Sequence, residues 1–290
     1  MPLAETDMLL VIAGFVLLML GGEFVVQGAV TIANRLRVPP LLVGFTVVAI
    51  GTSLPELAVA LEAVGNDTPD IAVGGVLGSN VANVMLVLGT AAVLGAASDP
   101  GPGVRRDAIA VAVATAILLA TVLIGKITSQ FGVLMLLGLA AYYTYSYLTS
   151  KAEGGDVEDS KSWLPENVLL AIPTTAVGGY MIWTGAGMLV EGATGLAIGY
   201  GISESVIGLS VVALGTSLPE LAVTLVAGLR GQGGVAVGNI LGSNVINILG
   251  ILGLASAYAG GIIIAPEFAG RDIWVVVLTS GFIVAMLLDE

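Results

Sequence analysis

The hexapeptide GTSLPE at Gly51–Glu56 occurs again at Gly215–Glu220, and both copies lie inside long apolar runs. A second shared block follows each copy at the same distance, GSNVAN at Gly78–Asn83 and GSNVIN at Gly242–Asn247. Both blocks are displaced by 164 positions, and about 26 of the 46 residues around them are identical. This identity, without a gap, indicates an internal duplication of the chain.

The composition around these blocks is that of a membrane protein. Hydrophobic residues make up 57% of the chain and charged residues 10%, and apolar runs recur at the length of a membrane-crossing helix. With no cysteine and no histidine, the chain has no disulfides, no thiol chemistry and no zinc or haem site of the usual ligand types. The net charge of −12 argues against nucleic acid as a partner. Glu5 and Asp7 stand where a cleavable signal would be basic, so the first apolar run is expected to span the membrane.

The apolar runs predict an all-α polytopic protein with nine spans, at Met8–Ala33, Leu41–Val64, Ile71–Ala97, Arg106–Gly125, Phe131–Ser150, Glu166–Ile198, Glu204–Leu229, Gly234–Ala259 and Asp272–Leu288. With the N-terminus outside, seven cations fall in inner loops, namely Arg35, Arg37, Arg105, Arg106, Lys151, Lys161 and Arg230. The outer loops then hold only Lys126 and Arg271. Since cytoplasmic loops are enriched in Lys and Arg, we predict that the N-terminus lies outside.

Five spans separate each element from its duplicate, so the two copies should cross the membrane in opposite directions. We therefore predict two inverted repeats, at 1–150 with five spans and at 166–290 with four, joined by a short cytoplasmic linker at 151–165. The counterpart of the fifth helix is expected to be missing from the second repeat, by truncation or in the lineage. The acidic linker lacks the spacing and the glycine of an EF-hand, which favours a solvated connector.

The repeated hexapeptide predicts a broken helix in each half. Gly51 and Thr52 weaken the helix, and Pro55 has no N–H and clashes with the preceding turn, so a break is expected near Thr52. Pro219 predicts the same break in the second half. Carbonyls freed inside a bilayer must face a polar cavity or bind something, and a cation is a natural ligand for them.

Glu56 and Glu220 follow these breaks near the middle of their spans, where an ionisable residue is a functional candidate. The second blocks add neutral oxygens, from Ser79 and Ser243 and from Asn83 and Asn247. A set of carboxylates, carbonyls and neutral oxygens without nitrogen or sulfur suits Ca²⁺ or Na⁺. Two buried charges are costly without a cation, so a carrier that occludes only when loaded must exchange one ion for another. The sequence thus predicts an antiporter and no enzyme.

The duplicated GTSLPE with its GSNxxN partners closely resembles the repeats of the sodium/calcium exchangers of the calcium/cation antiporter superfamily, and the prokaryotic type in particular. The resemblance implies two inverted five-helix repeats, exchange of Na⁺ for Ca²⁺, and a prokaryotic plasma membrane. It implies the following ion ligands: Glu56 and Glu220 for both ions, oxygens of Thr52 and Thr216, hydroxyls of Ser53, Ser217, Ser79 and Ser243, the amide of Asn83, and carbonyls of Ala49 and Ala213 at flanking sodium sites. The expected partners are these two ions and the lipid bilayer, with no cofactor and no obligate protein partner.

One position departs from the family pattern. Asn247 stands where many members, including potassium-dependent ones, have an aspartate. The centre then has only two carboxylates, and no potassium requirement is expected. Asn247 stays a predicted ligand.

Other interpretations of the same residues remain open. The glutamates could be structural and neutral at the helix breaks, the serines and threonines could bond back to their own helices, and Asn80 and Asn244 could satisfy backbone groups. Glu23 and Gln27, near the end of the first span, are expected to face the interface or neighbouring helices. A proton/calcium antiporter is the second functional hypothesis, and a cation channel is the third.

Overall fold

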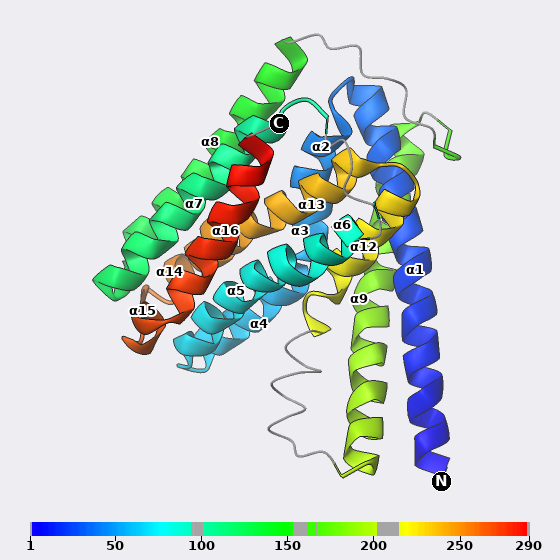
Figure 1. The fold of residues 1–290 in the computed structure, drawn as a ribbon, viewed down its shortest axis with the longest axis horizontal. Coiled ribbons are helices and arrows are strands. Elements are labelled where there is room, and N and C mark those ends of the chain that lie inside the picture. Colours follow the sequence, from blue (N-terminus) through cyan, green and yellow to red (C-terminus); the bar gives the residue numbers. More distant parts are fainter. Residues whose placement is uncertain are drawn as a thin grey trace.

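The computed structural model describes residues 2–93, 95, 101–152, 162–165, 167–201 and 215–288. The regular secondary structure of these residues is helical apart from two short strands (Figure 1). The first half contains α1 (Pro2–Leu36), α2 (Pro40–Val43), η1 (Gly44–Val48), α3 (Ala49–Thr52), α4 (Leu54–Gly65), α5 (Pro69–Ala82), η2 (Asn83–Leu88), α6 (Gly89–Val93), α7 (Val104–Ile124), β1 (Lys126–Thr128) and α8 (Ser129–Ala152). The second half contains α9 (Val168–Gly199), α12 (Leu218–Leu229), α13 (Gly233–Val245), η4 (Ile246–Leu252), α14 (Gly253–Tyr258), β2 (Gly261–Ile263), α15 (Glu267–Gly270) and α16 (Asp272–Leu288).

Six continuous helical runs in the described residues are long and apolar enough to cross a membrane, and the bent pair Pro40–Thr52 and Leu54–Gly65 makes a seventh. They correspond to seven of the nine predicted spans. The other two contain α12, with 12 residues, and α16, with 17 residues. The first part of the predicted span that ends in α12, residues 204–214, lies outside the described residues, as does most of the linker at 151–165.

The two longest helices, α1 and α9, form an antiparallel pair at one side of the molecule (Figure 1). Glycines spaced seven apart allow this close approach: a Cβ on Gly21 would lie 2.7 Å from the carbonyl oxygen of Gly178, and one on Gly14 would lie 2.6 Å from that of Gly185. Helices meet in this way through small residues in membrane bundles, where hydrophobicity alone does not drive them together.

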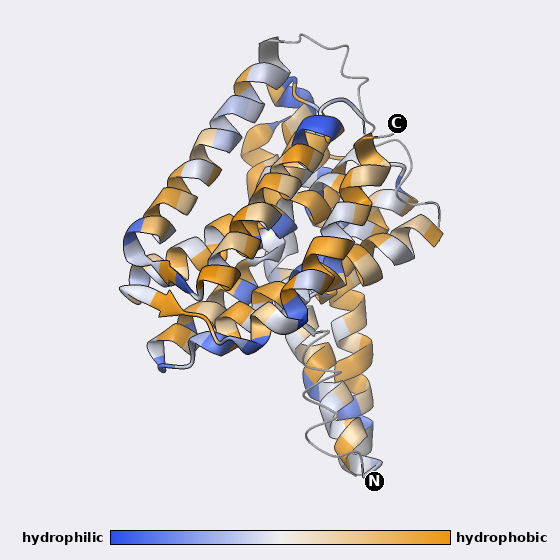
Figure 2. Ribbon diagram, turned by 60° about the vertical axis from the view of Figure 1, so that its left-hand side comes forward, coloured by the Kyte–Doolittle hydropathy of each residue, from blue (hydrophilic) through white to orange (hydrophobic). Residues whose placement is uncertain are grey.

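Helix α13 lies at the centre of the other helices and is buried along nearly its whole length. One apolar core joins the halves, because Leu41 and Phe45 of the first half pack in the same cluster as Leu241 and Ile251 of the second. Figure 2 shows apolar residues along the length of the helices, with hydrophilic residues gathered mainly near helix ends and turns. This is the distribution that a bilayer requires.

Two kinds of local structure were not predicted. Strands β1 and β2 pair antiparallel, with Ile127 opposite Ile262, and so join a turn of each half. In addition η1, η2 and η4 are π-helical segments, in which hydrogen bonds join residues five apart in place of four. π-Helical segments are rare in proteins, and those that occur are often at functional sites. Their positions beside the repeated blocks therefore point to the same functional region as the glutamates.

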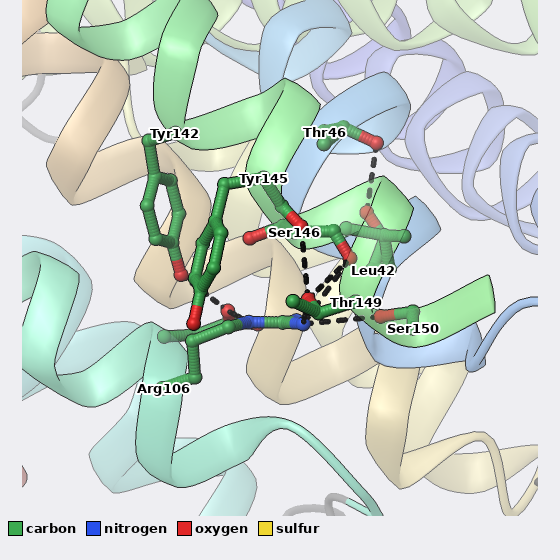
Figure 3. A network of polar contacts seen from close by, with 9 residues as sticks. Leu42, Thr46, Arg106, Tyr142, Tyr145, Ser146, Thr149 and Ser150 are labelled. Carbon is green, nitrogen blue, oxygen red and sulfur yellow. Dashed lines mark hydrogen bonds and ion pairs between the residues drawn. The ribbon is translucent and has the colours of Figure 1, made fainter. Parts of the chain in front are cut away.

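A polar network ties α7 to α8 (Figure 3). Arg106 donates to the Asp107 carboxylate at 2.9 Å and to the hydroxyls of Thr149 and Ser150, both at 3.1 Å. The Tyr142 hydroxyl donates to the same Asp107 oxygen. Tyr142 therefore has a polar role within the bundle.

Candidate cation site between the two halves

In both repeated hexapeptides the equivalent serine lies directly before the helix that carries the glutamate. Ser53 separates α3 from α4 with φ −86° and ψ 6°, and Ser217 precedes α12 with φ −90° and ψ 0°. The two helices on either side of Ser53 are bent by 46°. The predicted break near Thr52 is confirmed, and the matching dihedral angles show that the duplication extends to backbone conformation.

Both glutamates lie just after these serines and are buried. Glu56, in the first turn of α4, is 7% exposed, and Glu220, in the first turn of α12, is fully buried. Neither side chain is turned to the lipid-facing surface. Two carboxylates are thus held inside the protein, where ionised groups need compensation.

Serines of the second blocks bond to these carboxylates in the same way in both halves. Ser79 donates to Oε1 of Glu56 at 3.4 Å, and Ser243 donates to Oε1 of Glu220 at 3.3 Å. Ser53 adds a bond between the halves, since its hydroxyl donates to the same oxygen of Glu220 at 3.3 Å. The structure therefore brings Ser53, Ser79 and Ser243 to the two glutamates.

The asparagines also bond across the interface between the halves. Asn83 donates from Nδ2 to Oδ1 of Asn244 at 3.1 Å, and Asn247 donates from Nδ2 to the Ser79 hydroxyl at 3.2 Å. Asn244 thus accepts a bond from a side chain, whereas it was expected to satisfy backbone. The asparagine side chains of the second blocks and the glutamates form one polar layer between the halves.

Several buried oxygens of this layer have no hydrogen-bond partner in the part of the chain that is described. They are Oε2 of Glu56 and of Glu220, Oδ1 of Asn83 and of Asn247, and Oγ of Ser217; both amide atoms of Asn80 are likewise unpaired. Buried acceptor atoms normally have a hydrogen-bond partner, because a buried acceptor without one lowers the stability of the fold by about 1–3 kcal/mol. A concentration of unpaired oxygens at one place is suited to a ligand that needs many oxygens and no hydrogen donor, which is a metal cation.

The remaining predicted ligands differ in what they contact. Thr52 is buried and lies within hydrogen-bond distance of the Ala49 carbonyl, Asn239 and Ser243. The Ala49 carbonyl also accepts the Ser53 N–H at 3.1 Å. Thr216 is half-buried. Ala213 lies outside the described residues.

Asn239 and Thr224 belong to this layer, although the sequence analysis did not select them. Asn239 is fully buried, and its amide bonds to Thr52 and Thr224. It lies four residues before Ser243 on the same helix, so the i, i+4 spacing could have placed it on the same face. Among the described residues no three acidic, histidine or cysteine side chains gather to hold a metal, so carboxylates here supply only part of any coordination shell.

Comparison with known proteins supports the duplication and the fold. The family model described as "Sodium/calcium exchanger protein" matches residues 6–148 and 170–289. The chain is 35% identical to the inner membrane protein YrbG of Escherichia coli, over 93% of this chain and 85% of that protein. It is 31% identical to the sodium/calcium exchanger MaX1 of Methanosarcina acetivorans, over 87% of this chain and 83% of that protein.

A solved structure has the same fold. The sodium/calcium exchanger from Methanococcus jannaschii superposes with a TM-score of 0.83 at 27% identity, and the match covers 99% of this chain and 96% of that one. The family match spans both halves of the chain and the structural match spans nearly all of it, so both concern the whole molecule rather than one motif.

Proposed function

This chain belongs to the sodium/calcium exchanger family, and on that premise we propose that it exchanges Na⁺ for Ca²⁺ across the membrane by alternating access. The family makes it a multi-pass integral membrane antiporter of cations and not an enzyme. The proposal concerns which ions this chain couples, where they bind and how the chain is oriented.

The observation that carries the proposal is the pair of buried glutamates, each with one carboxylate oxygen that has no hydrogen-bond partner among the described residues. Oε1 of Glu56 and of Glu220 accepts from serine hydroxyls, whereas neither Oε2 has a partner in the described structure. Two buried carboxylates carry a charge of −2 when ionised, and effective desolvation costs are several kcal/mol for each ion. One Ca²⁺ neutralises this charge, and so do two Na⁺.

Exchange follows from this charge balance. A site that is stable in a water-excluded state only when a cation is bound cannot return across the membrane empty, so inward movement of one ion must be coupled to outward movement of another. Calcium takes about six to eight oxygens, and the shared layer offers carboxylate, amide, hydroxyl and carbonyl oxygens. We assign the two glutamates to both ions, with neutral oxygens of the layer completing each shell: those of Thr52, Thr216, Ser53, Ser217, Ser79, Ser243, Asn83, Asn247, Ala49 and Ala213.

The orientation belongs to the same proposal. We place the N-terminus outside and residues 151–165 in the cytoplasm. The halves 1–150, with five spans, and 166–290, with four, are inverted repeats in a prokaryotic plasma membrane. In support, α1 begins and α16 ends toward opposite ends of the molecule (Figure 1). An odd number of crossings produces this arrangement. The relative in Escherichia coli is named as an inner membrane protein.

The test is ⁴⁵Ca²⁺ uptake into liposomes that contain the purified protein. We expect uptake to require an opposing Na⁺ gradient at fixed pH, and Glu56→Gln to abolish it because both ions lose a ligand charge. Glu62→Gln is the matched control, since it removes the same charge from an exposed position of the same helix.

Other results would reject the proposal. Uptake driven by a pH gradient alone would identify a proton/calcium antiporter, and flux without any counter-ion would identify a channel. Wild-type transport in both Glu56→Gln and Glu220→Gln would reject the shared site.

A further inference from the structure

Asn239 makes a bridge between the halves that the repeated blocks do not predict. It is fully buried in α13. Its Oδ1 accepts the Thr52 hydroxyl at 3.1 Å, and its Nδ2 donates to the Thr224 hydroxyl at 3.2 Å and to the main-chain oxygen of Glu220 at 3.4 Å. One amide therefore contacts the broken helix of the first half and the glutamate-bearing helix of the second.

The orientation of this amide follows from its partners. The main-chain oxygen of Glu220 can only accept, so the NH₂ group of Asn239 must face it. Turning the amide over would direct Oδ1 at that carbonyl and lose the bond. The oxygen of Asn239 is thereby directed at Thr52.

Thr52 has a single hydroxyl proton and three possible acceptors for it, one of which is the Ser243 hydroxyl oxygen at 3.4 Å. The distance from its Oγ1 to Oδ1 of Asn239 is 3.1 Å, and the distance to the Ala49 carbonyl is 3.3 Å. The Ala49 carbonyl already accepts the Ser53 N–H at 3.1 Å. A carbonyl has two lone pairs. Without Asn239, the Thr52 proton would therefore be shared between the second lone pair of Ala49, which is the nearer acceptor, and the Ser243 hydroxyl oxygen.

We propose that Asn239 is a positioning residue for sodium: it accepts the only hydroxyl proton of Thr52 and thereby leaves a lone pair of the Ala49 carbonyl available to a sodium ion. The inference rests on the function proposed above, in which Ala49 and Thr52 supply neutral oxygens. Thr224 and the main-chain oxygen of Glu220 together hold Asn239 in this orientation. Calcium depends more on the two carboxylate charges, because a divalent ion gains about twice as much from each of them.

The duplication makes this arrangement unequal in the two halves. At the shift of 164 positions, Asn239 corresponds to Gly75 and Thr224 corresponds to Ala60. Neither residue of the first half carries a hydrogen-bonding side chain. The repeats would otherwise make two sodium sites equivalent. Only the site beside Thr52 and Ala49 has its ligands held in place by the hydrogen bonds of an asparagine at this position.

The test compares two substitutions of Thr224 in the full-length protein in liposomes, with half-saturating Na⁺ and Ca²⁺ measured separately. Thr224→Val keeps the volume and removes the nearer of the two acceptors of the Asn239 amide, so that only the longer bond to the main-chain oxygen of Glu220 still opposes its turning. We expect half-saturating Na⁺ to rise about threefold to tenfold, the equivalent of one hydrogen bond, with half-saturating Ca²⁺ within about twofold of wild type. Thr224→Ser keeps the hydroxyl and should retain the wild-type ratio of the two values.

A purely structural role predicts the opposite order, because valine fills the site and serine leaves a cavity. Asn239→Leu should reproduce the Thr224→Val effect. If Asn239→Leu fails to fold, the comparison of Thr224→Val with Thr224→Ser still tests the inference. Equal shifts for both ions, no shift in Thr224→Val, or a larger shift in Thr224→Ser would overturn the inference while leaving the proposed function intact. Absence of Na⁺-driven uptake in the wild type would overturn both.

Discussion

At the scale of single residues, Asn247 tests how the charge of the site is set. Its Nδ2 donates to Ser79, which in turn donates to Glu56. Asn247→Asp adds a third acid at this interface, and the added charge attracts a divalent ion twice as strongly as a monovalent one. We expect half-saturating Ca²⁺ to fall about tenfold relative to half-saturating Na⁺, a difference of about 1.4 kcal/mol.

The control for Asn247→Asp adds the same charge elsewhere. Asn66 follows α4 and is exposed, so Asn66→Asp should leave the ratio of the two ions unchanged. Unchanged selectivity in Asn247→Asp itself would argue against Asn247 as a ligand of the central site.

At the scale of elements, the close approach of α1 and α9 depends on glycines at the crossing. A Cβ on Gly178 would lie 2.8 Å from the Gly21 carbonyl oxygen, whereas one on the neighbouring Gly179 meets no described atom within 4 Å. Gly178→Ala should therefore force the helices apart and lower the free energy of unfolding by about 1–3 kcal/mol. Gly179→Ala should change it little. Thermal unfolding in detergent measures both, and equal melting temperatures would contradict the packing described here.

The Arg–Asp pairs of the two halves offer a second comparison between elements. Asp107 is fully buried and accepts from Arg106 and Tyr142, whereas Arg271 and Asp272 form a pair in which the side chains are 89% and 40% exposed. Breaking a buried pair costs about 3–5 kcal/mol, so we expect Asp107→Asn to destabilise strongly. Asp272→Asn should cost about 0–1 kcal/mol, as exposed pairs do. Similar melting temperatures for the two variants would show that the α7–α8 network contributes little.

At the scale of the whole molecule, contacts between the halves join α1 to the end of α12. Arg230 donates to Glu23 at 2.8 Å, and Gln27 and Trp163 donate to the other oxygen of the same carboxylate. Glu23 and Gln27, expected at the interface or against neighbouring helices, therefore contact a neighbouring helix end and the segment before α9. Because Arg230 is 58% exposed, this pair positions α1 more than it stabilises the fold.

The inverted arrangement can be tested at two equivalent positions. Gly65 ends α4, and Leu229 ends α12 at the equivalent position, 164 residues later in the chain. Both residues are exposed. The chain has no cysteine, so Gly65→Cys and Leu229→Cys each introduce a single reactive thiol. A membrane-impermeant maleimide added to intact cells should label Gly65→Cys, and Leu229→Cys should be labelled only after the membrane is opened. Labelling of both from the same side would contradict the inverted topology.

Much of the architecture is encoded in local patterns. Apolar runs of membrane length and the duplicated GTSLPE and GSNxxN blocks identify the helices, the break at Ser53 and the burial of Glu56 and Glu220, because hydrophobicity, proline chemistry and the cost of a charge in lipid act on short stretches. The same patterns led to the family and to the expectation of a cation site.

The tertiary structure alone decided which groups meet across the interface of the halves. The bonds from Ser53 to Glu220, from Asn247 to Ser79 and from Thr52 to Asn239 join residues more than 160 positions apart. Neither helical periodicity nor residue spacing specifies such contacts, since they depend on how α3 and α13 cross. The pairing of β1 with β2 is of the same kind, because it joins segments that are far apart in the sequence.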